Sequence, residues 1–192
     1  HYAAPYGGAP TVVIVHDWGG SMRRWEDIAA QFQELGFGVV LFNLTGHGID
    51  GNYYRFTDEQ VAALARDVAT AVDFARRSAD GEVYLVGAGL GANFALEVAA
   101  ADETVGKVVA ISPGMHYRGV RLRREMGELL NGRVMLMASQ EDIYSTRSIE
   151  LFEAIFENDP PVQLYSNAGH GVWIIKRVPE ALGTIARWLS GE

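Results

Sequence analysis

Short runs of apolar, often β-branched residues alternate with longer amphipathic stretches along the chain, and this alternation restricts the fold more than any other feature. Six runs stand out, at residues 11–16, 38–44, 82–87, 107–112, 133–139 and 162–166. Apolar runs of this length predict buried strands. Because strands that alternate with helices form a mainly parallel sheet covered on both faces, the sequence predicts a three-layer α/β sandwich with six visible strands.

The stretches between these strands carry helix signals. Helices are expected near residues 22–35, 58–78, 90–101, 147–157 and 179–190. Thr57 and Gln60 form the pattern of a capping box before the second helix, and Pro179 stands at the first turn of the last one. Only the loops 43–57 and 112–132 are long. Ligand sites of such sheets lie beyond the carboxyl ends of the strands, so the function is expected in the loops there.

Composition narrows the class of protein further. A chain of 192 residues with 48% apolar residues is long enough for one buried core, and a single domain over residues 1–192 is predicted. The net charge of −8 argues against a nucleic-acid surface, which needs a basic face. Without cysteine the chain has neither disulfides nor a cysteine nucleophile. No apolar run reaches the roughly 18 residues of a membrane span.

The chain starts at His1 rather than methionine, so a missing leader is compatible with the sequence. Cytoplasmic and exported locations therefore both stay open at this point, and the oligomeric state does not follow from the residues.

The turn after the third predicted strand determines the expected chemistry. It reads Gly87-Ala88-Gly89-Leu90-Gly91-Ala92 and runs into an apolar helical stretch, which is the setting of a nucleophile elbow, G-x-S-x-G. The central residue of such an elbow adopts a positive-φ conformation, which glycine takes without strain. Gly89, however, provides no hydroxyl where the serine should stand.

Two other interpretations of this turn fit its residues. One is an ordinary glycine-rich turn between strand and helix, and the other is a dinucleotide-binding motif, because Gly87, Gly89 and Ala92 satisfy G-x-G-x-x-A. A dinucleotide motif belongs to the first βαβ unit and needs an acidic residue about 20 residues further on. Here the motif follows the third strand, and the next strand ends with Ile111 and Ser112. The elbow is therefore favoured.

Polar residues follow three further strands. The first strand runs into residues 16–21, His-Asp-Trp-Gly-Gly-Ser, where the backbone N–H of Trp18 is expected to face one oxygen together with that of Leu90. Asp142 follows the fifth strand, and His170 follows the sixth. Each feature alone has a plain structural alternative: a packed His16, a solvated acid, and a glycine-rich turn. Their joint placement at one edge of the sheet favours a site.

These residues resemble the bacterial α/β-hydrolase family, especially small lid-less members similar to dienelactone hydrolases and carboxylesterases. The resemblance covers nearly the whole chain and rests on residues 16–21, 45–48 and 112–119 and on the pair 142 and 170. It implies that Asp142 orients His170, and that His170 acts as general base on a nucleophile at position 89. It also implies oxyanion donors at Trp18 and Leu90 and substrate contacts at His16, Asp17 and His116.

The chain departs from this family in two places. The usual amino-terminal hairpin is lacking before Thr11, and no substantial lid is inserted between the fourth and fifth strands, which predicts an open cleft. The loop 112–132 also carries four arginines, which either hold an anionic ligand group or form a solvated helix face: Arg118, Arg121, Arg123 and Arg124. The histidines lack metal-ligand spacing, so neither a metal nor another cofactor is expected.

Removing the serine of a triad costs on the order of 10⁶ in kcat, so acyl-enzyme turnover is not expected with Gly89. The favoured hypothesis is an ester-hydrolase-type site that is catalytically impaired, or a pseudoenzyme that binds a small ester-like molecule. One alternative is an active hydrolase that uses water activated by His170 and Asp142, or Ser112 or Ser139 as another nucleophile. A second alternative is a module that binds a protein partner.

Overall fold

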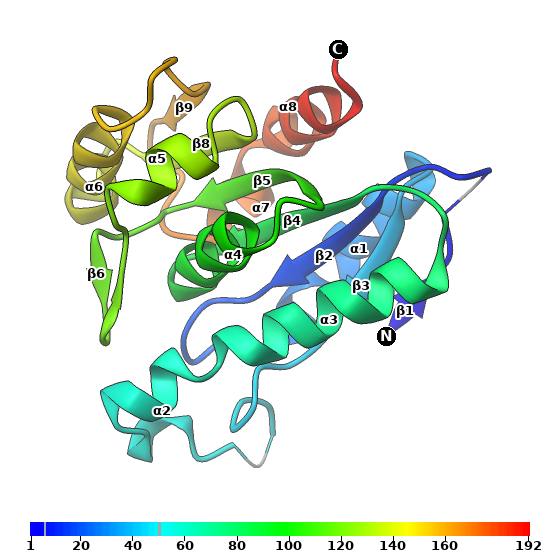
Figure 1. Ribbon diagram of the computed structural model, residues 1–192, viewed down its shortest axis with the longest axis horizontal. Helices are drawn as coiled ribbons and strands as arrows, with labels where there is room; N and C mark the ends of the chain where they lie inside the picture. Colours follow the sequence, from blue (N-terminus) through cyan, green and yellow to red (C-terminus); the bar gives the residue numbers. More distant parts are fainter. Residues whose placement is uncertain (6, 50) are drawn as a thin grey trace.

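The computed structural model describes residues 1–5, 7–49 and 51–192, and its centre is a seven-stranded sheet with the order β1-β3-β2-β4-β5-β8-β9 (Figure 1). The strands are β1 (Tyr2–Ala3), β2 (Thr11–Val15), β3 (Gly38–Leu41), β4 (Val83–Ala88), β5 (Val105–Ile111), β8 (Val134–Ser139) and β9 (Val162–Tyr165). All neighbouring pairs are parallel except β1 with β3. The predicted α/β fold with a mainly parallel sheet is confirmed, and the six predicted runs are its parallel strands.

The seventh strand was not predicted. Tyr2 and Ala3 pair antiparallel with Val39 and Val40 of β3, where the sequence indicated no amino-terminal hairpin strand. Two residues are too few to show a periodic pattern, because the strand signal needs about four residues. Tertiary contacts hold the segment instead: the Tyr2 hydroxyl donates to the Ser78 carbonyl at 2.9 Å.

Helices cover both faces of the sheet. They are α1 (Glu26–Glu34), α2 (Asp58–Ala62), α3 (Ala65–Ser78), α4 (Leu90–Ala101), α5 (Glu125–Leu129), α6 (Ile143–Glu153), α7 (Val172–Arg177) and α8 (Pro179–Ser190), with short 3₁₀ helices at Met22–Trp25 and Tyr53–Arg55. Figure 1 shows α3 and α4 in front of the sheet and α1 and α7 behind it. In β2, Val13 and Val15 pack in the front core, whereas Val12 and Ile14 pack in the rear core. Successive side chains of a strand point to opposite faces, which produces these two cores.

The helix predictions hold with local corrections. The capping box of Thr57 and Gln60 and the first-turn position of Pro179 are confirmed. The expected helix 58–78 is divided into α2 and α3, and α6 begins at Ile143 rather than near 147. It begins there because the Asp142 side chain accepts a hydrogen bond from the Ser145 N–H and so caps the helix. Helices α5 and α7 were not predicted.

The loop 112–132 is more ordered than its sequence indicated. It contains a two-stranded hairpin, β6 (His116–Tyr117) and β7 (Val120–Arg121), followed by α5. Of the helices described, none combines the length and the apolar character needed to cross a bilayer.

Candidate active site

The turn between β4 and α4 has the backbone geometry of a nucleophile elbow. Gly89 has φ 55° and ψ −123°, a positive-φ conformation that a residue with a side chain adopts only with strain, and its N–H donates to the Ile111 carbonyl at 2.9 Å. The flanking glycines permit close packing: a Cβ on Gly91 would meet the backbone of Val15 and His16, at the end of β2. The predicted strand–turn–helix element is therefore present, with no side chain at its centre.

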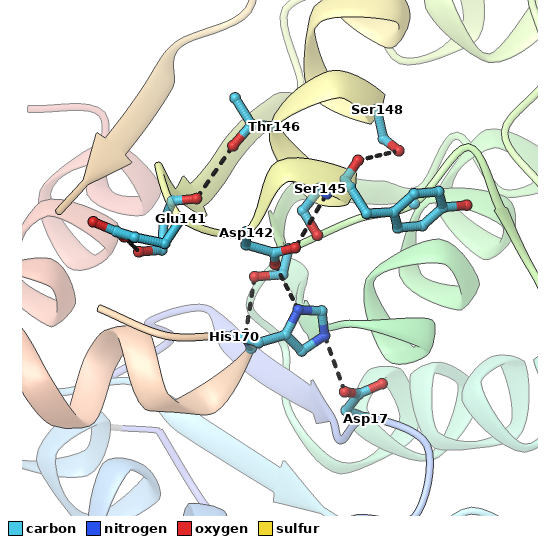
Figure 2. Close-up of polar contacts among 12 residues, drawn as sticks. Asp17, Glu141, Asp142, Ser145, Thr146, Ser148 and His170 are labelled. Atoms are coloured by element: carbon cyan, nitrogen blue, oxygen red, sulfur yellow. Dashed lines mark hydrogen bonds and ion pairs between the residues drawn. The ribbon is translucent and has the colours of Figure 1, made fainter. Parts of the chain in front are cut away.

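Asp142 and His170 lie side by side above the sheet (Figure 2). Asp142 is the N-cap of α6, and His170 lies in the loop between β9 and α7. The His170 Nδ1 atom lies 2.6 Å from Asp142 Oδ2, and Asp142 Oδ1 accepts the Ser145 N–H. Burial raises the pKa of Asp142, but its hydrogen bonds with His170 and Ser145 lower it more, so the net direction is down. The two residues thus form the contact expected of an acid that orients a histidine.

The Asp17 carboxylate lies at the other side of the His170 ring. Its Oδ2 atom is 3.2 Å from His170 Nε2, and Figure 2 shows this contact as a dashed line. Its Oδ1 atom accepts the backbone N–H of Trp18 at 2.6 Å and that of Leu90 at 2.8 Å. The two N–H groups expected to face a ligand oxygen do converge on one oxygen atom, and that atom belongs to Asp17.

Asp17 also occupies the space above Gly89. A Cβ atom built on Gly89 would overlap the Cγ and both oxygens of the Asp17 side chain. Sequence reasoning placed Asp17 among the substrate contacts and missed this position. The available signal was an acidic residue directly before the expected donor Trp18, but its conformation depends on a helix 73 residues away in the chain.

The two neighbouring carboxylates change the protonation of His170. Its hydrogen bonds with Asp142 and then with Asp17 raise its pKa to about 9, against the opposing effect of burial. The ring is therefore a cation between two carboxylates near neutral pH. In this resting form it has no free lone pair with which to accept a proton.

His16 is a packed residue rather than a free ligand contact. Its ring is 1% exposed, Nδ1 donates to the Asp17 carbonyl at 2.8 Å, and Nε2 accepts the Leu44 N–H at 3.1 Å. Burial lowers its pKa to about 4, so the ring is neutral. Both nitrogens are used to join the loops after β2 and β3, which favours the structural alternative over a substrate contact.

The hairpin β6–β7 places its polar residues away from the predicted roles. His116 is exposed, and its Nε2 atom accepts the Gly119 N–H at 3.2 Å within its own turn. The Arg118 guanidinium lies 4.6 Å from the centre of the Trp18 ring and donates to the Phe56 carbonyl. Arg118 therefore packs on the loop that carries Asp17, while the other three arginines are exposed: Arg121, Arg123 and Arg124.

Ser112 and Ser139, the two serines considered as other nucleophiles, are fully buried. The Ser112 hydroxyl oxygen accepts the Gly171 N–H at 3.0 Å. The Ser139 hydroxyl donates to Glu141 and accepts the Ala168 N–H at 3.1 Å. Both hydroxyls hold the loops that carry Asp142 and His170, so the geometry contradicts their use as nucleophiles.

A cleft of about 250 Å³ opens beside the site. Asp17 and His170 form part of its wall, together with Trp18, Arg24 and Trp173. A small molecule in this cleft therefore reaches the carboxylate and the imidazole at the same time.

The parallel sheet, the elbow and the order of the site loops define an α/β hydrolase. Residues 9–134 match the family model described as serine aminopeptidase, S33, and the chain belongs to this family.

Solved structures similar to the chain support the same fold. Dienelactone hydrolase from Anabaena variabilis superposes with a TM-score of 0.77 at 20% identity, over 99% of this chain and 88% of that one. An esterase from Pyrococcus furiosus superposes with a TM-score of 0.75 at 16% identity, over 96% and 82% of the two chains. A structure reported with carboxylesterases of Nitrososphaera gargenis has a TM-score of 0.80 at 12% identity, over 99% and 93%. No curated protein matches the chain in sequence.

Proposed function

We propose that this chain, as one domain over residues 1–192, is an ester-hydrolase-type α/β hydrolase whose serine-type covalent catalysis is disabled and whose cleft binds a small molecule. One observation carries the proposal. The Asp17 carboxylate takes up the space of a nucleophile side chain at Gly89 and both N–H groups of the oxyanion site.

Acyl-enzyme chemistry needs a nucleophile, a free base and free oxyanion donors. Gly89 offers no nucleophile, and the loss of that group alone costs on the order of 10⁶ in kcat. The raised pKa of His170, about 9, removes the base at neutral pH. Trp18 and Leu90 already donate to Asp17, and each missing oxyanion donor costs a further factor of about 10² to 10³.

The cleft supports a small ligand rather than a polymer. Its volume of about 250 Å³ lies just below the range of typical small-molecule sites, which span roughly 300–1,000 Å³. The net charge of −8 disfavours a polyanionic partner. An uncharged, ester-like molecule of a few heavy atoms fits these two conditions.

Direct activation of water by His170 and Asp142 is the second candidate. It needs a neutral His170 ring, which the two neighbouring carboxylates oppose below a pH of about 9. This route therefore predicts ester hydrolysis that appears only in alkaline solution and disappears in His170→Ala.

Hydrolysis of p-nitrophenyl acetate tests the proposed function. We expect no turnover above buffer by the natural chain or by Gly89→Ser, because a serine at position 89 collides with Asp17. The double variant Asp17→Ala/Gly89→Ser frees the space and the donors, so it should gain turnover, and the further change His170→Ala should remove it. Turnover by the natural chain at neutral pH would overturn the proposal. A folded but inactive double variant would overturn the assignment of the elbow.

A further inference from the structure

The two oxygens of the Asp17 carboxylate have different surroundings. Oδ1 accepts two backbone N–H groups, from Trp18 and Leu90, and so uses both of its lone pairs. Among the residues that the structure describes, Oδ2 has one polar partner, His170 Nε2 at 3.2 Å, and keeps a second lone pair. The side chain is 31% exposed and lines the cleft, so this oxygen is within reach of a ligand.

A carboxylate that acts as a nucleophile needs one oxygen held by donors, one oxygen free to attack, and a base that later activates water. Asp17 meets the first two conditions, and His170, oriented by Asp142, meets the third. We infer that Asp17 is the nucleophile of this site, and that its substrates are small alkyl compounds with an anionic leaving group such as a halide. This inference rests on the proposed function, because it uses the same small-molecule cleft without serine chemistry.

This arrangement explains why residue 89 is a glycine. A side chain with a Cβ at position 89 would overlap the Asp17 carboxylate, so the carboxylate can stand at the elbow only if residue 89 is glycine. The glycine is then a requirement of the site, and the reactive group comes from the loop after β2 in place of the turn after β4.

The substrate class follows from the chemistry of carboxylates. Attack on the carbonyl carbon of an ester would give an anhydride, whereas attack on a saturated carbon gives an ester, which this site is equipped to hydrolyse. The cleft of about 250 Å³ admits a short alkyl chain. Arg24 lines the same cleft and supplies a positive charge for a departing anion.

In the first step, Asp17 Oδ2 forms a bond to the substrate carbon while the bond from that carbon to the halogen breaks. The bonding electron pair leaves with the halide. Asp17 becomes a neutral ester whose carbonyl oxygen, Oδ1, still faces the N–H groups of Trp18 and Leu90. Because the Asp17 charge is lost, one of the two partners that raise the pKa of His170 disappears, which lowers this pKa and favours release of the ring proton to solvent.

In the second step, neutral His170 takes a proton from a water molecule as that water attacks Asp17 Cγ. The negative charge that develops on Oδ1 is stabilised by the same two N–H groups. The bond from Cγ to Oδ2 then breaks, and the departing alkoxide receives the proton from His170. The new carboxyl group of Asp17 passes its remaining proton to His170, which restores the carboxylate and the cationic ring. The sum is alkyl halide plus water to alcohol, halide and one proton, with the Asp17 carboxylate restored.

Bromide release from 1-bromobutane tests the inference. The natural chain should release bromide continuously. The control Glu26→Gln should do the same, because it changes only an exposed carboxylate at the start of α1. Asp17→Asn should fall to the rate of buffer. His170→Ala should stop after about one equivalent, with a butyl group on Asp17 in peptide mass spectra, because a general base contributes roughly 10²–10⁴-fold. Absence of bromide release, or an adduct on another residue, would overturn the inference.

A single turnover of the natural chain in water labelled with heavy oxygen provides a test that needs no variant. The label should enter the Asp17 carboxylate and not the first butanol formed, whereas labelled butanol would mean direct attack by water and would overturn the inference. Hydrolysis of p-nitrophenyl acetate by the same preparation separates the two ideas. Ester turnover contradicts the proposed function, while missing bromide release without ester turnover contradicts only the role of Asp17.

Discussion

The carboxylate of Asp17 occupies the space that a side chain at Gly89 would take. A Cβ on residue 89 would overlap the carboxylate, while Leu90, the next residue, donates its N–H to that same carboxylate at 2.8 Å. A side chain at one position is therefore incompatible with the observed conformation of the other. This relationship determines which variants can report on the site.

Gly89→Ala should destabilise the protein by about 1–3 kcal/mol from backbone strain alone, because a φ of 55° with a ψ of −123° strains any residue that has a side chain. The overlap with Asp17 adds to this cost. Asp17→Ala should relieve the overlap and leave the strain, so the two changes should couple by roughly 0.5–3 kcal/mol. Urea unfolding of both single variants and the double variant measures this coupling.

Gly36→Ala is the matched control for strain without overlap. Gly36 has φ 92°, and a Cβ there would meet no atom within 4 Å. Its destabilisation should be unchanged by Asp17→Ala. Additive effects of Gly89→Ala and Asp17→Ala would contradict the overlap between the two positions.

His170 should titrate with a pKa of about 9 in an NMR titration of the imidazole signals. Asp142 is the largest cause of this raised pKa and Asp17 the next, so Asp17→Asn and Asp142→Asn should each lower it toward the ordinary value of 6.5. An unchanged pKa of His170 in Asp17→Asn would contradict the ion pair between the two residues.

The same pKa predicts a stability profile. The pKa of His170 is raised on folding from 6.5 to about 9, so its contribution is complete below a pH of 6.5 and is lost as the pH rises through about 9. The free energy of unfolding should therefore fall over this interval. Solvent screening reduces the size of the effect, because the ring is 40% exposed. In His170→Ala the alkaline fall should be smaller.

Hydrophobic patterns predicted the fold, because β2, β3, β4 and β8 are fully buried and mainly apolar, and β5 is largely so. The edge strand β9 is only partly buried, although its run was predicted as a buried strand. The loops that hold Asp142 and His170 could also be assigned to the site. Each loop follows a strand, and the carboxyl ends of the parallel strands lie at one edge of the sheet. Strand β1 and helix α7, with two and six residues, are too short to give a pattern.

The role of Asp17 could not be predicted in the same way. Its residue type was visible beside the expected oxyanion donor, but its contacts come from three separate segments: Trp18 in its own loop, Leu90 at the start of α4, and His170 after β9. Contacts among three separate segments depend on side-chain conformations and on the registers of three strands. The sequence contains no local pattern for these.

His16 should matter for stability rather than for ligand affinity. His16→Ala leaves the Leu44 N–H without its buried acceptor, and an unpaired buried group costs about 1–3 kcal/mol before any cavity is counted. The control His116→Ala changes an exposed ring and should cost at most about 1 kcal/mol. Thermal unfolding compares the two, and equal losses would contradict the structural role of His16.

The lowered pKa of His16 predicts that the free energy of unfolding also falls in acid, which gives the stability profile an acid limb. Burial lowers this pKa from 6.5 to about 4, so the stabilisation is complete above a pH of 6.5 and is lost as the pH falls through about 4. We expect the acid limb to be weaker in His16→Ala, whereas the alkaline limb that depends on His170 should remain. A profile that loses both limbs would show that the two histidines are not independent.

Ser139 should act on the site through the two loops that it joins. Its buried hydroxyl donates to Glu141 and accepts the Ala168 N–H, and these neighbours precede Asp142 and His170 in the chain. Ser139→Ala should cost about 1–3 kcal/mol, because the Ala168 N–H is left unpaired. Ser166→Ala, which removes an exposed hydroxyl bonded to Gln140, should change stability by no more than about 0.5 kcal/mol. If the loops separate in Ser139→Ala, the contact between Asp142 and His170 weakens and the pKa of His170 falls, which the same NMR titration detects. A destabilised Ser139→Ala protein with an unchanged pKa of His170 would limit this serine to packing.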